Sequence, residues 1–271
     1  MYGVQAAEAL QPAADIAVRI ASAWLASCLL LTACAGGTGA NGTGHDARVP
    51  GERRHQDGRM DDDALTRARQ AMVESQVRAR GVTDVRVLDA MATVPRHEFV
   101  SAEVADEAYT DSPLPIGYGQ TISQPYIVAL MTQLARPEPD HVALEVGTGS
   151  GYQAAILSPL VRHVYTIELV PELADVAARR LARYANVTPR QGDGYQGWPE
   201  HGPFDIIVVT AAPEEVPPAL REQLKVGGRL VIPVGPVGAT QELRVIVRQA
   251  DGTYTDRNVT AVRFVPLQRA R

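Results

Sequence analysis

The stretch that decides the fold is Val142-Ala143-Leu144-Glu145-Val146-Gly147-Thr148-Gly149-Ser150-Gly151. A short apolar run that ends in three glycines at alternate positions is typical of a buried strand followed by a tight turn that passes close to a ligand. The residues that follow, 152–157, have helical composition. Strand, glycine loop and helix together form the first unit of a doubly wound nucleotide-binding sheet, with the ligand beyond the carboxyl end of the strand. The loop alone does not identify that ligand.

Composition narrows the class of protein. With 271 residues and 45% apolar content, the chain is long enough and apolar enough to bury a core. Its net charge of -5 argues against general nucleic-acid binding. The two cysteines, Cys28 and Cys34, both precede the region of the glycine loop, and the six histidines lack metal-ligand spacing. We therefore expect no metal and no nucleic-acid partner.

The N-terminal arm allows two interpretations, a targeting signal or a leader that lies upstream of the true start of the protein. Residues 20–33 are uncharged and mostly apolar, too few to span a bilayer but suited to the apolar core of a secretory signal. Leu31-Thr32-Ala33-Cys34 resembles the lipobox of bacterial lipoproteins, in which the cysteine is lipidated. The alternative is a leader upstream of the true start, because Glu8 and Asp15 oppose a single Arg19.

These features predict three regions. Residues 1–34 are expected to be a signal or lipoprotein leader. Residues 35–59, rich in Gly, Asp, Arg and His, cannot form a core and are expected to be a flexible linker. Residues 60–271 are expected to be the folded domain.

Two helices are predicted at the start of this domain. Acidic residues 61–63 favour a helix start, and Gly81 follows basic residues that suit a helix end. Asp84 is expected to cap a second helix that ends before Pro95. Residues 109–126, dense in Pro, Gly and hydroxyl side chains, are expected to be a functional loop without regular structure.

Strands and helices alternate after the glycine loop. Further strands are predicted at 163–168, 186–191, 204–210, 229–234, 242–248 and 259–264, the last two as an antiparallel hairpin around Asp251-Gly252. Helices are predicted at 171–185 and 217–224, with a break at 225–228 before the next strand. This order predicts an α/β fold, a three-layer αβα sandwich with a doubly wound, mostly parallel sheet. The two early helices add an N-terminal helical layer.

Three acidic residues bear on the ligand. Glu168 ends the second strand, about 20 residues after the loop, where a carboxylate accepts from the two ribose hydroxyls of a nucleotide. Glu145 inside the first strand would repel a pyrophosphate but attract the cationic amino acid end of S-adenosylmethionine. Asp193, between Gly192 and Gly194, is placed to accept from the adenine amine. These residues favour a methyltransferase and leave an NAD-dependent oxidoreductase as the alternative.

Several longer stretches extend this interpretation, and through them the chain from about 60 to 267 resembles the protein-L-isoaspartate O-methyltransferase family. The most specific are Thr121-Ile122-Ser123-Gln124-Pro125 and Arg263-Phe264-Val265-Pro266-Leu267. The others are Val94-Pro95-Arg96-His97-Glu98-Phe99-Val100, Leu114 to Gln120, Leu144 to Tyr152, Gly192-Asp193-Gly194, Pro203 to Asp205, Thr210 to Pro213 and Gly227 to Leu230.

The resemblance implies a class I S-adenosylmethionine-dependent methyltransferase that repairs damaged proteins. Its substrate is the α-carboxyl of L-isoaspartyl residues, and the methyl ester then collapses to a succinimide without the enzyme. Ser123 is the implied catalytic residue, and Val265 and Pro266 join it in substrate binding. The residues expected to bind the cofactor are Gln120, Thr121, Ile122, Glu145, Gly147, Thr148, Gly149, Gly151, Glu168, Leu169, Asp193 and Gly194.

The arm and the domain predict different compartments. S-adenosylmethionine is made in the cytosol, so a cytoplasmic protein is expected, in contact with a membrane only if the lipobox-like segment is used. The protein is also expected to be a monomer. The alternative is a lipoprotein anchored through Cys34 that keeps the fold as a catalytically idle peptide-binding module.

Overall fold

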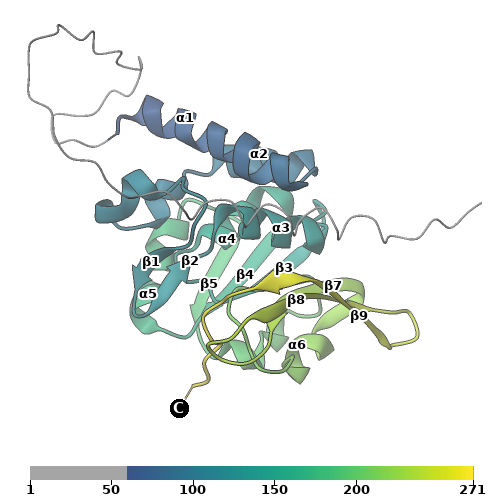
Figure 1. Ribbon diagram of the computed structural model, residues 1–271. Coiled ribbons are helices and arrows are strands. Elements are labelled where there is room, and N and C mark those ends of the chain that lie inside the picture. The colour runs from purple at the N-terminus through teal and green to yellow at the C-terminus, as the bar shows by residue number, and fades with distance from the viewer. Residues whose placement is uncertain (1–59, 271) are drawn as a thin grey trace, which may run out of the picture. The chain divides into compact units, whose positions relative to one another are not determined.

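A computed structural model describes residues 60–270 of the chain (Figure 1). The leader predicted at 1–34 and the linker predicted at 35–59 lie outside the described residues. Everything below concerns the domain that begins at Met60.

The N-terminal helices begin and end where their capping residues predict. Asp61 accepts a hydrogen bond from the Ala64 amide at 2.7 Å and begins α1, Asp62–Met72. The chain stays helical through a π-helical turn, η1 (Val73–Val77), and a 3-10 turn, η2 (Arg78–Arg80). It ends at Gly81, where φ is 92°. Asp84 caps α2, Val85–Thr93, through the Arg86 amide.

The segment predicted to be irregular, 109–126, contains a small hairpin, so that prediction was wrong. Strands β1 (Leu114–Gly117) and β2 (Gln120–Ile122) pair in antiparallel register. Each strand has only three or four residues, too few for an alternating pattern to show in the sequence. Two 3-10 turns, η3 (Arg96–Phe99) and η4 (Ala102–Glu107), precede the hairpin, and α3 (Pro125–Ala135) follows it.

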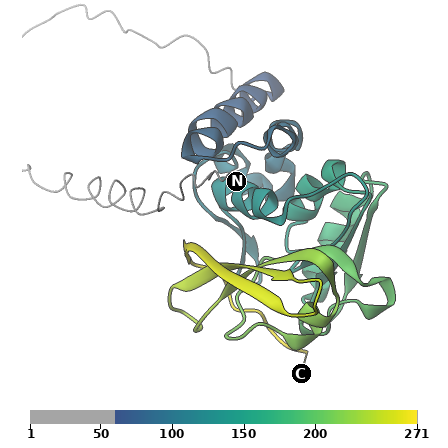
Figure 2. The same ribbon diagram turned by 90° about the vertical axis from the view of Figure 1, so that its right-hand side faces the viewer.

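A seven-stranded sheet forms the centre of the domain, and its strand order is β5-β4-β3-β6-β7-β8-β9. The first five strands in this order run parallel, β8 pairs antiparallel with β7, and β9 pairs antiparallel with β8. The strands are β3 (Val142–Val146), β4 (His163–Glu168), β5 (Val187–Gln191), β6 (Phe204–Val209), β7 (Leu224–Val234), β8 (Gln241–Arg248) and β9 (Tyr254–Val262). Figure 2 views the sheet from the side of the β8–β9 hairpin, which ends in yellow. The predicted mostly parallel sheet with a C-terminal hairpin is confirmed.

Side chains of β3 alternate between two apolar cores, one on each face of the sheet. Ala143 belongs to a core that includes residues of α1, α2, α3, α4 (Tyr152–Leu157) and α5 (Pro171–Leu181), whereas Leu144 and Val146 belong to a second core that includes Leu220 of α6 (Pro218–Glu222). The helical elements of this part of the chain are α4 (Tyr152–Leu157), η5 (Ser158–Leu160), α5 (Pro171–Leu181), η6 (Gly194–Gln196), η7 (Pro199–His201) and α6 (Pro218–Glu222). The result is the predicted three-layer αβα sandwich, with α1 and α2 as a further helical layer (Figure 1).

Four predicted boundaries needed correction. The helix predicted at 171–185 ends at Leu181, and the one predicted at 217–224 is the shorter α6. The predicted break at 225–228 is a bulge inside β7, because Leu224 already pairs with Phe204 before the register shifts. The strand predicted at 259–264 is β9, which starts earlier at Tyr254; its first residues are polar and exposed, so apolar content did not mark them.

Candidate active site

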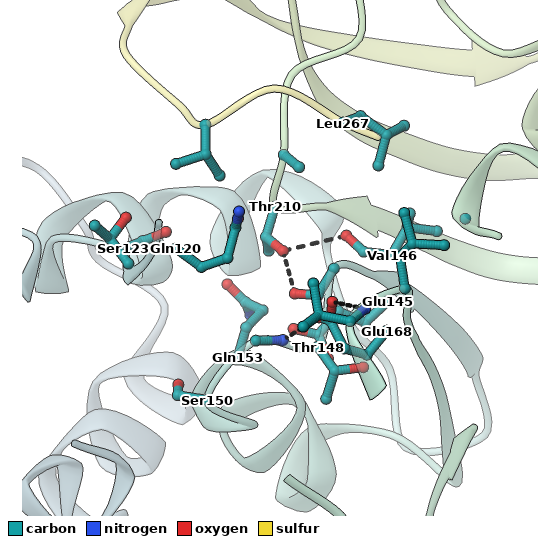
Figure 3. A pocket seen from close by; sticks show the side chains of 18 of the residues that line it. Gln120, Ser123, Glu145, Val146, Thr148, Ser150, Gln153, Glu168, Thr210 and Leu267 are labelled. Carbon is teal, nitrogen blue, oxygen red and sulfur yellow. Dashed lines mark hydrogen bonds between the residues drawn. The ribbon is translucent and has the colours of Figure 1, made fainter. Parts of the chain in front are cut away.

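A cavity lies at the carboxyl end of β3, between the glycine loop, the β2 segment and the C-terminal segment (Figure 3). This is the point where the sheet order reverses, since β4 lies on one side of β3 and β6 on the other. Ligands of open α/β sheets bind at such a switch point. The cavity encloses about 770 Å³, including its opening to solvent.

Thirteen of the fifteen predicted site residues line this cavity. They are Gln120, Thr121, Ile122, Ser123, Glu145, Gly147, Thr148, Gly149, Glu168, Leu169, Gly194, Val265 and Pro266. The other two do not line it. Gly151 is the N-cap of α4, with φ of 91°, and Asp193 accepts a hydrogen bond from the Tyr195 amide at the start of η6. The structure thus brings together segments about 150 residues apart in sequence.

The glycine loop is held by a threonine from the neighbouring strand end. Gly147 and Gly149 have φ of 96° and 53°, a region that side chains disfavour. A Cβ on Gly147 would lie 2.7 Å from the Oγ1 atom of Thr210. That hydroxyl donates to the Gly147 carbonyl at 2.6 Å. Glycine is therefore required at 147 both by the backbone angle and by the close approach of Thr210.

Glu168 fastens the same loop from the end of β4. Its Oε2 atom accepts from the Gly149 amide at 2.7 Å, and its Oε1 atom accepts from the Val170 amide at 2.9 Å. The carboxylate is almost fully buried but lines the cavity. Each oxygen keeps a second lone pair, so the ribose contact predicted for Glu168 is compatible with these bonds. The sequence did not reveal that Glu168 also shapes the loop.

Glu145 is fully buried beneath the loop (Figure 3). Its Oε2 atom accepts from the Thr166 hydroxyl at 2.7 Å, and that hydroxyl lies 2.5 Å from the Thr148 hydroxyl. Its Oε1 atom has no partner among residues 60–270. Burial, reinforced by repulsion from Glu168 and opposed by the Thr166 hydrogen bond, raises the pKa of Glu145 to about 8. The pKa of this carboxyl is therefore raised into the neutral pH range, whereas the charge argument from the sequence took an ordinary ionised glutamate.

The raised pKa of Glu145 predicts a pH-dependent stability. Between the ordinary value of 4.5 and about 8, the unfolded chain releases a proton that the folded protein keeps. The free energy of unfolding should therefore fall as pH rises through this window, by on the order of 1 kcal/mol per pH unit. Glu145→Gln removes the titrating group and keeps an acceptor for Thr166. In urea unfolding at pH 5.5, 6.5 and 7.5, the free energy of unfolding of the wild type should fall with pH more steeply than that of Glu145→Gln. Equal pH dependence of the two proteins would contradict the assignment.

Two further segments that line the cavity are those of Ser123 and of Val265 and Pro266. Ser123 follows β2 directly, and its hydroxyl has no hydrogen-bond partner among the residues that the structure describes. The segment of Val265 and Pro266 is fixed by a parallel bridge between Pro266 and Ala212. The Ala212 amide donates to the Val265 carbonyl at 2.8 Å, and the Leu267 amide donates to the Ala212 carbonyl at 2.9 Å. Backbone hydrogen bonds therefore hold this wall, together with the Gln241 side chain, which accepts from the Phe264 amide at 2.9 Å.

Sequence reasoning missed part of the lining. The additional residues are Val128, Val146, Ser150, Tyr152, Gln153, Ile167, Val170, Thr210, Ala211, Leu267 and Gln268. Thr210 and Ala211 belong to a stretch that carried the family resemblance, so their position after β6 was a usable signal. Gln153, buried in α4, gave none, because its burial depends on Thr132 of α3, to whose hydroxyl it donates at 2.9 Å. Within residues 60–270 no cluster of His, Cys, Asp and Glu suited to a metal ion is found.

Comparison with known proteins adds the family. The family model described as protein-L-isoaspartate(D-aspartate) O-methyltransferase matches residues 67–271. A protein-L-isoaspartate O-methyltransferase of Synechococcus sp. (strain JA-2-3B'a(2-13)) is 53% identical over 213 residues, which cover 76% of this chain and 87% of the relative. One of Opitutus terrae is 55% identical over 210 residues, 77% of this chain and 90% of the relative.

Comparison with solved structures points to the same family. A protein-L-isoaspartate O-methyltransferase superposes with a TM-score of 0.67 at 29% identity, covering 73% of this chain and 65% of that one. A putative enzyme of the same name from Plasmodium falciparum, in complex with S-adenosyl-L-homocysteine, gives 0.65 at 26% identity and covers 74% of this chain and 99% of that one. With the fold, the cavity at the switch point and the matched sequence in agreement, the chain belongs to the protein-L-isoaspartate(D-aspartate) O-methyltransferase family.

Proposed function

We propose that this protein transfers a methyl group from S-adenosylmethionine to the α-carboxyl of L-isoaspartyl residues in damaged proteins and peptides. The observation that carries the proposal is the match of residues 67–271 to the family together with relatives of that name at more than half identity. The oxidoreductase and the idle peptide-binding lipoprotein find no support in these comparisons.

The cavity suits the methyl donor. Two buried oxygens that line it, Glu145 Oε1 and Gln153 Oε1, have no hydrogen-bond partner among the described residues. A buried polar atom without a partner costs free energy, and a ligand that carries an ammonium group supplies donors to both oxygens, the Glu145 carboxyl releasing its proton as the cation binds. The positive φ angles of Gly147 and Gly149 leave the loop backbone bare of side chains where the ligand passes.

The chemistry asks little of the protein beyond positioning. When bound, the donor supplies a methyl group on a positively charged sulfur. The acceptor carboxylate has an ordinary pKa of about 3.5 to 4, so it is ionised at neutral pH and needs no general base. The protein's task is to align the acceptor and to exclude water from it. We assign the alignment to the Ser123 hydroxyl, which donates to a carboxylate oxygen, and the opposite wall to Val265 and Pro266.

Of the three acidic residues assigned to the cofactor, Glu168 and Asp193 should differ in how strongly their replacement weakens cofactor binding. Glu168→Gln leaves one acceptor oxygen for two backbone amides, so either Gly149 or Val170 faces an amide NH2 group. Affinity for S-adenosylhomocysteine, measured by calorimetric titration, should fall about tenfold or more, since hydrogen bonds to charged groups contribute roughly 1.5 to 3 kcal/mol. Asp193→Ala should weaken binding less, because Asp193 does not line the cavity. The reverse order would contradict this assignment.

The activity is tested directly with two peptides that differ only in one linkage. One hexapeptide carries an internal L-isoaspartyl residue and the other the normal aspartyl isomer. With methyl-labelled S-adenosylmethionine, base-labile label should appear in the isoaspartyl peptide alone. S-adenosylhomocysteine should raise the melting temperature and NAD should not, because only a ligand that binds the native state stabilises it. Equal labelling of both peptides, or none, would overturn the proposal.

We further propose that the enzyme is a cytoplasmic monomer without a nucleic-acid partner. The support is the cytosolic origin of the methyl donor and the net charge of -5. Among residues 60–270, no helix has the length and apolar character needed to cross a bilayer. Mass spectrometry of the native N-terminus tests the location, since a diacylglyceryl group on Cys34 would contradict it. Gel filtration tests the oligomeric state.

A further inference from the structure

The turn between β1 and β2 holds an aromatic residue in an unfavourable backbone conformation. Gly117 pairs with Gln120, so Tyr118 and Gly119 are the two central residues of a hairpin turn, with φ of 52° and 70°. Such turns favour Asn-Gly or Gly-Gly, because both central residues need positive φ. Among residues 60–270 the other non-glycine residue with positive φ is Arg136, at a helix C-cap where this conformation is common.

Within residues 60–270, no hydrogen bond of the Tyr118 side chain compensates for this choice of residue. The Tyr118 side chain is 60% exposed, one of four large apolar side chains in the described part of the chain that are so exposed. Its hydroxyl has no hydrogen-bond partner there, and only its backbone carbonyl accepts a long contact from the Gln120 side chain. Residues in a strained backbone conformation are concentrated at functional sites, and Tyr118 has no side-chain hydrogen bond in the described part of the chain that offsets its strain.

The turn stands beside the cavity. Gln120, which lines the cavity, is two residues from Tyr118, so their Cα atoms lie within about 7 Å of each other. Ile116, on the other arm of the hairpin, approaches the glycine loop, since a Cβ on Gly149 would lie 3.3 Å from its Cδ1 atom. Ser123 follows β2 directly. Tyr118 is thus exposed to solvent two residues before the part of the hairpin that lines the cavity.

We propose that Tyr118 is a substrate-contact residue whose ring packs on the main chain of the peptide next to the isoaspartyl residue. This inference rests on the proposed function. A repair enzyme must accept many neighbouring sequences, so its contacts outside the reacting residue must be with what every peptide shares. A flat aromatic ring offers a large contact area, loses little conformational freedom and needs no particular side chain opposite it.

The decisive variant is Tyr118→Asn, because local stability and substrate binding should change in opposite directions. Asparagine is favoured at this turn position, so the melting temperature should stay the same or rise by about 2 °C. KM for an isoaspartyl hexapeptide should rise about tenfold, with kcat and the affinity for S-adenosylhomocysteine unchanged. Tyr118→Phe keeps the ring and should retain the wild-type KM. Val226→Asn, at an equally exposed site in the β7 bulge, is the matched control and should leave KM unchanged.

Varying the peptide tests the contact with the main chain. Hexapeptides with Ala, Lys or Glu beside the isoaspartyl residue should show the same rise in KM within about twofold. A rise for only one flanking residue would overturn the main-chain contact, and an unchanged KM in Tyr118→Asn would overturn the role of Tyr118. A wild-type enzyme that methylates none of the isoaspartyl peptides would instead refute the proposed function, so the two failures are distinguishable.

Discussion

Replacing Gly147 with alanine should abolish measurable binding of the methyl donor. The added Cβ would lie 2.7 Å from Thr210 Oγ1, in a backbone conformation with φ of 96°. Relief requires either the loop or Thr210 to move, and Thr210 is the group that fixes the loop carbonyl at 2.6 Å. We expect affinity for S-adenosylhomocysteine to fall at least about 100-fold and the free energy of unfolding to fall by roughly 2 to 5 kcal/mol. Titration calorimetry and urea unfolding measure the two effects.

Gly252→Ala is a control that introduces alanine at a positive φ angle without the steric clash expected at Gly147. Gly252 has a similar φ of 83° in the β8–β9 turn, and no atom lies within 4 Å of a Cβ built there. This variant should lose some stability and keep full affinity for the ligand. If Gly147→Ala and Gly252→Ala bind S-adenosylhomocysteine equally well, the close packing of Thr210 against the loop does not matter for binding, and the assignment fails.

The second large effect is expected at Ser123. Removing its hydroxyl in Ser123→Ala takes away the donor assigned to align the acceptor carboxylate. Because a small misplacement of reacting groups costs about 100-fold in rate, we expect kcat to fall by about that factor. The melting temperature should not change, because the hydroxyl makes no hydrogen bond to residues 60–270 that its removal would break. Methyl transfer to the isoaspartyl hexapeptide, followed at saturating donor, measures the loss.

Ligand affinity provides the control for Ser123. Ser123→Ala should bind S-adenosylhomocysteine as the wild type does, whereas Glu168→Gln should not. Ser123→Thr keeps the hydroxyl and should recover part of the turnover. Equal loss of cofactor affinity in the Ser123 and Glu168 variants would contradict the division between substrate and cofactor residues.

Local chemistry predicted much of the fold. The strand 163–168 and the caps Asp61 and Asp84 were located correctly, because β-branched and aromatic residues favour a strand and a carboxylate before a helix binds its first amides. The hairpin β1–β2 was missed because its pairing, and not its composition, creates it. The start of β9 at Tyr254 was missed for a related reason, since an exposed edge strand need not be apolar.

The residues of the candidate site also fall into those that local sequence predicts and those that it does not. Residue types and spacing pointed to the glycine loop, Glu145 and Glu168, because a loop that approaches a nucleotide needs glycine and a strand end can carry an acid. Ser123, Val265 and Pro266 followed only from the family resemblance, since a serine before Gln124-Pro125 is also an ordinary turn residue. Thr210, Gln153 and Leu267 were not assigned to the site.

The sequence by itself determined that this protein has a glycine loop after a buried strand, acids at two strand ends and the family's motifs. Only the tertiary structure decided the raised pKa of Glu145, the fastening of the loop by Thr210 and Glu168, and the place of Tyr118 in the hairpin turn before Gln120. The physical reason is the distance along the chain between the residues that interact. Capping and strand formation depend on adjacent residues, whereas burial, and with it a pKa or a close contact, depends on segments that meet only when the sheet closes around them.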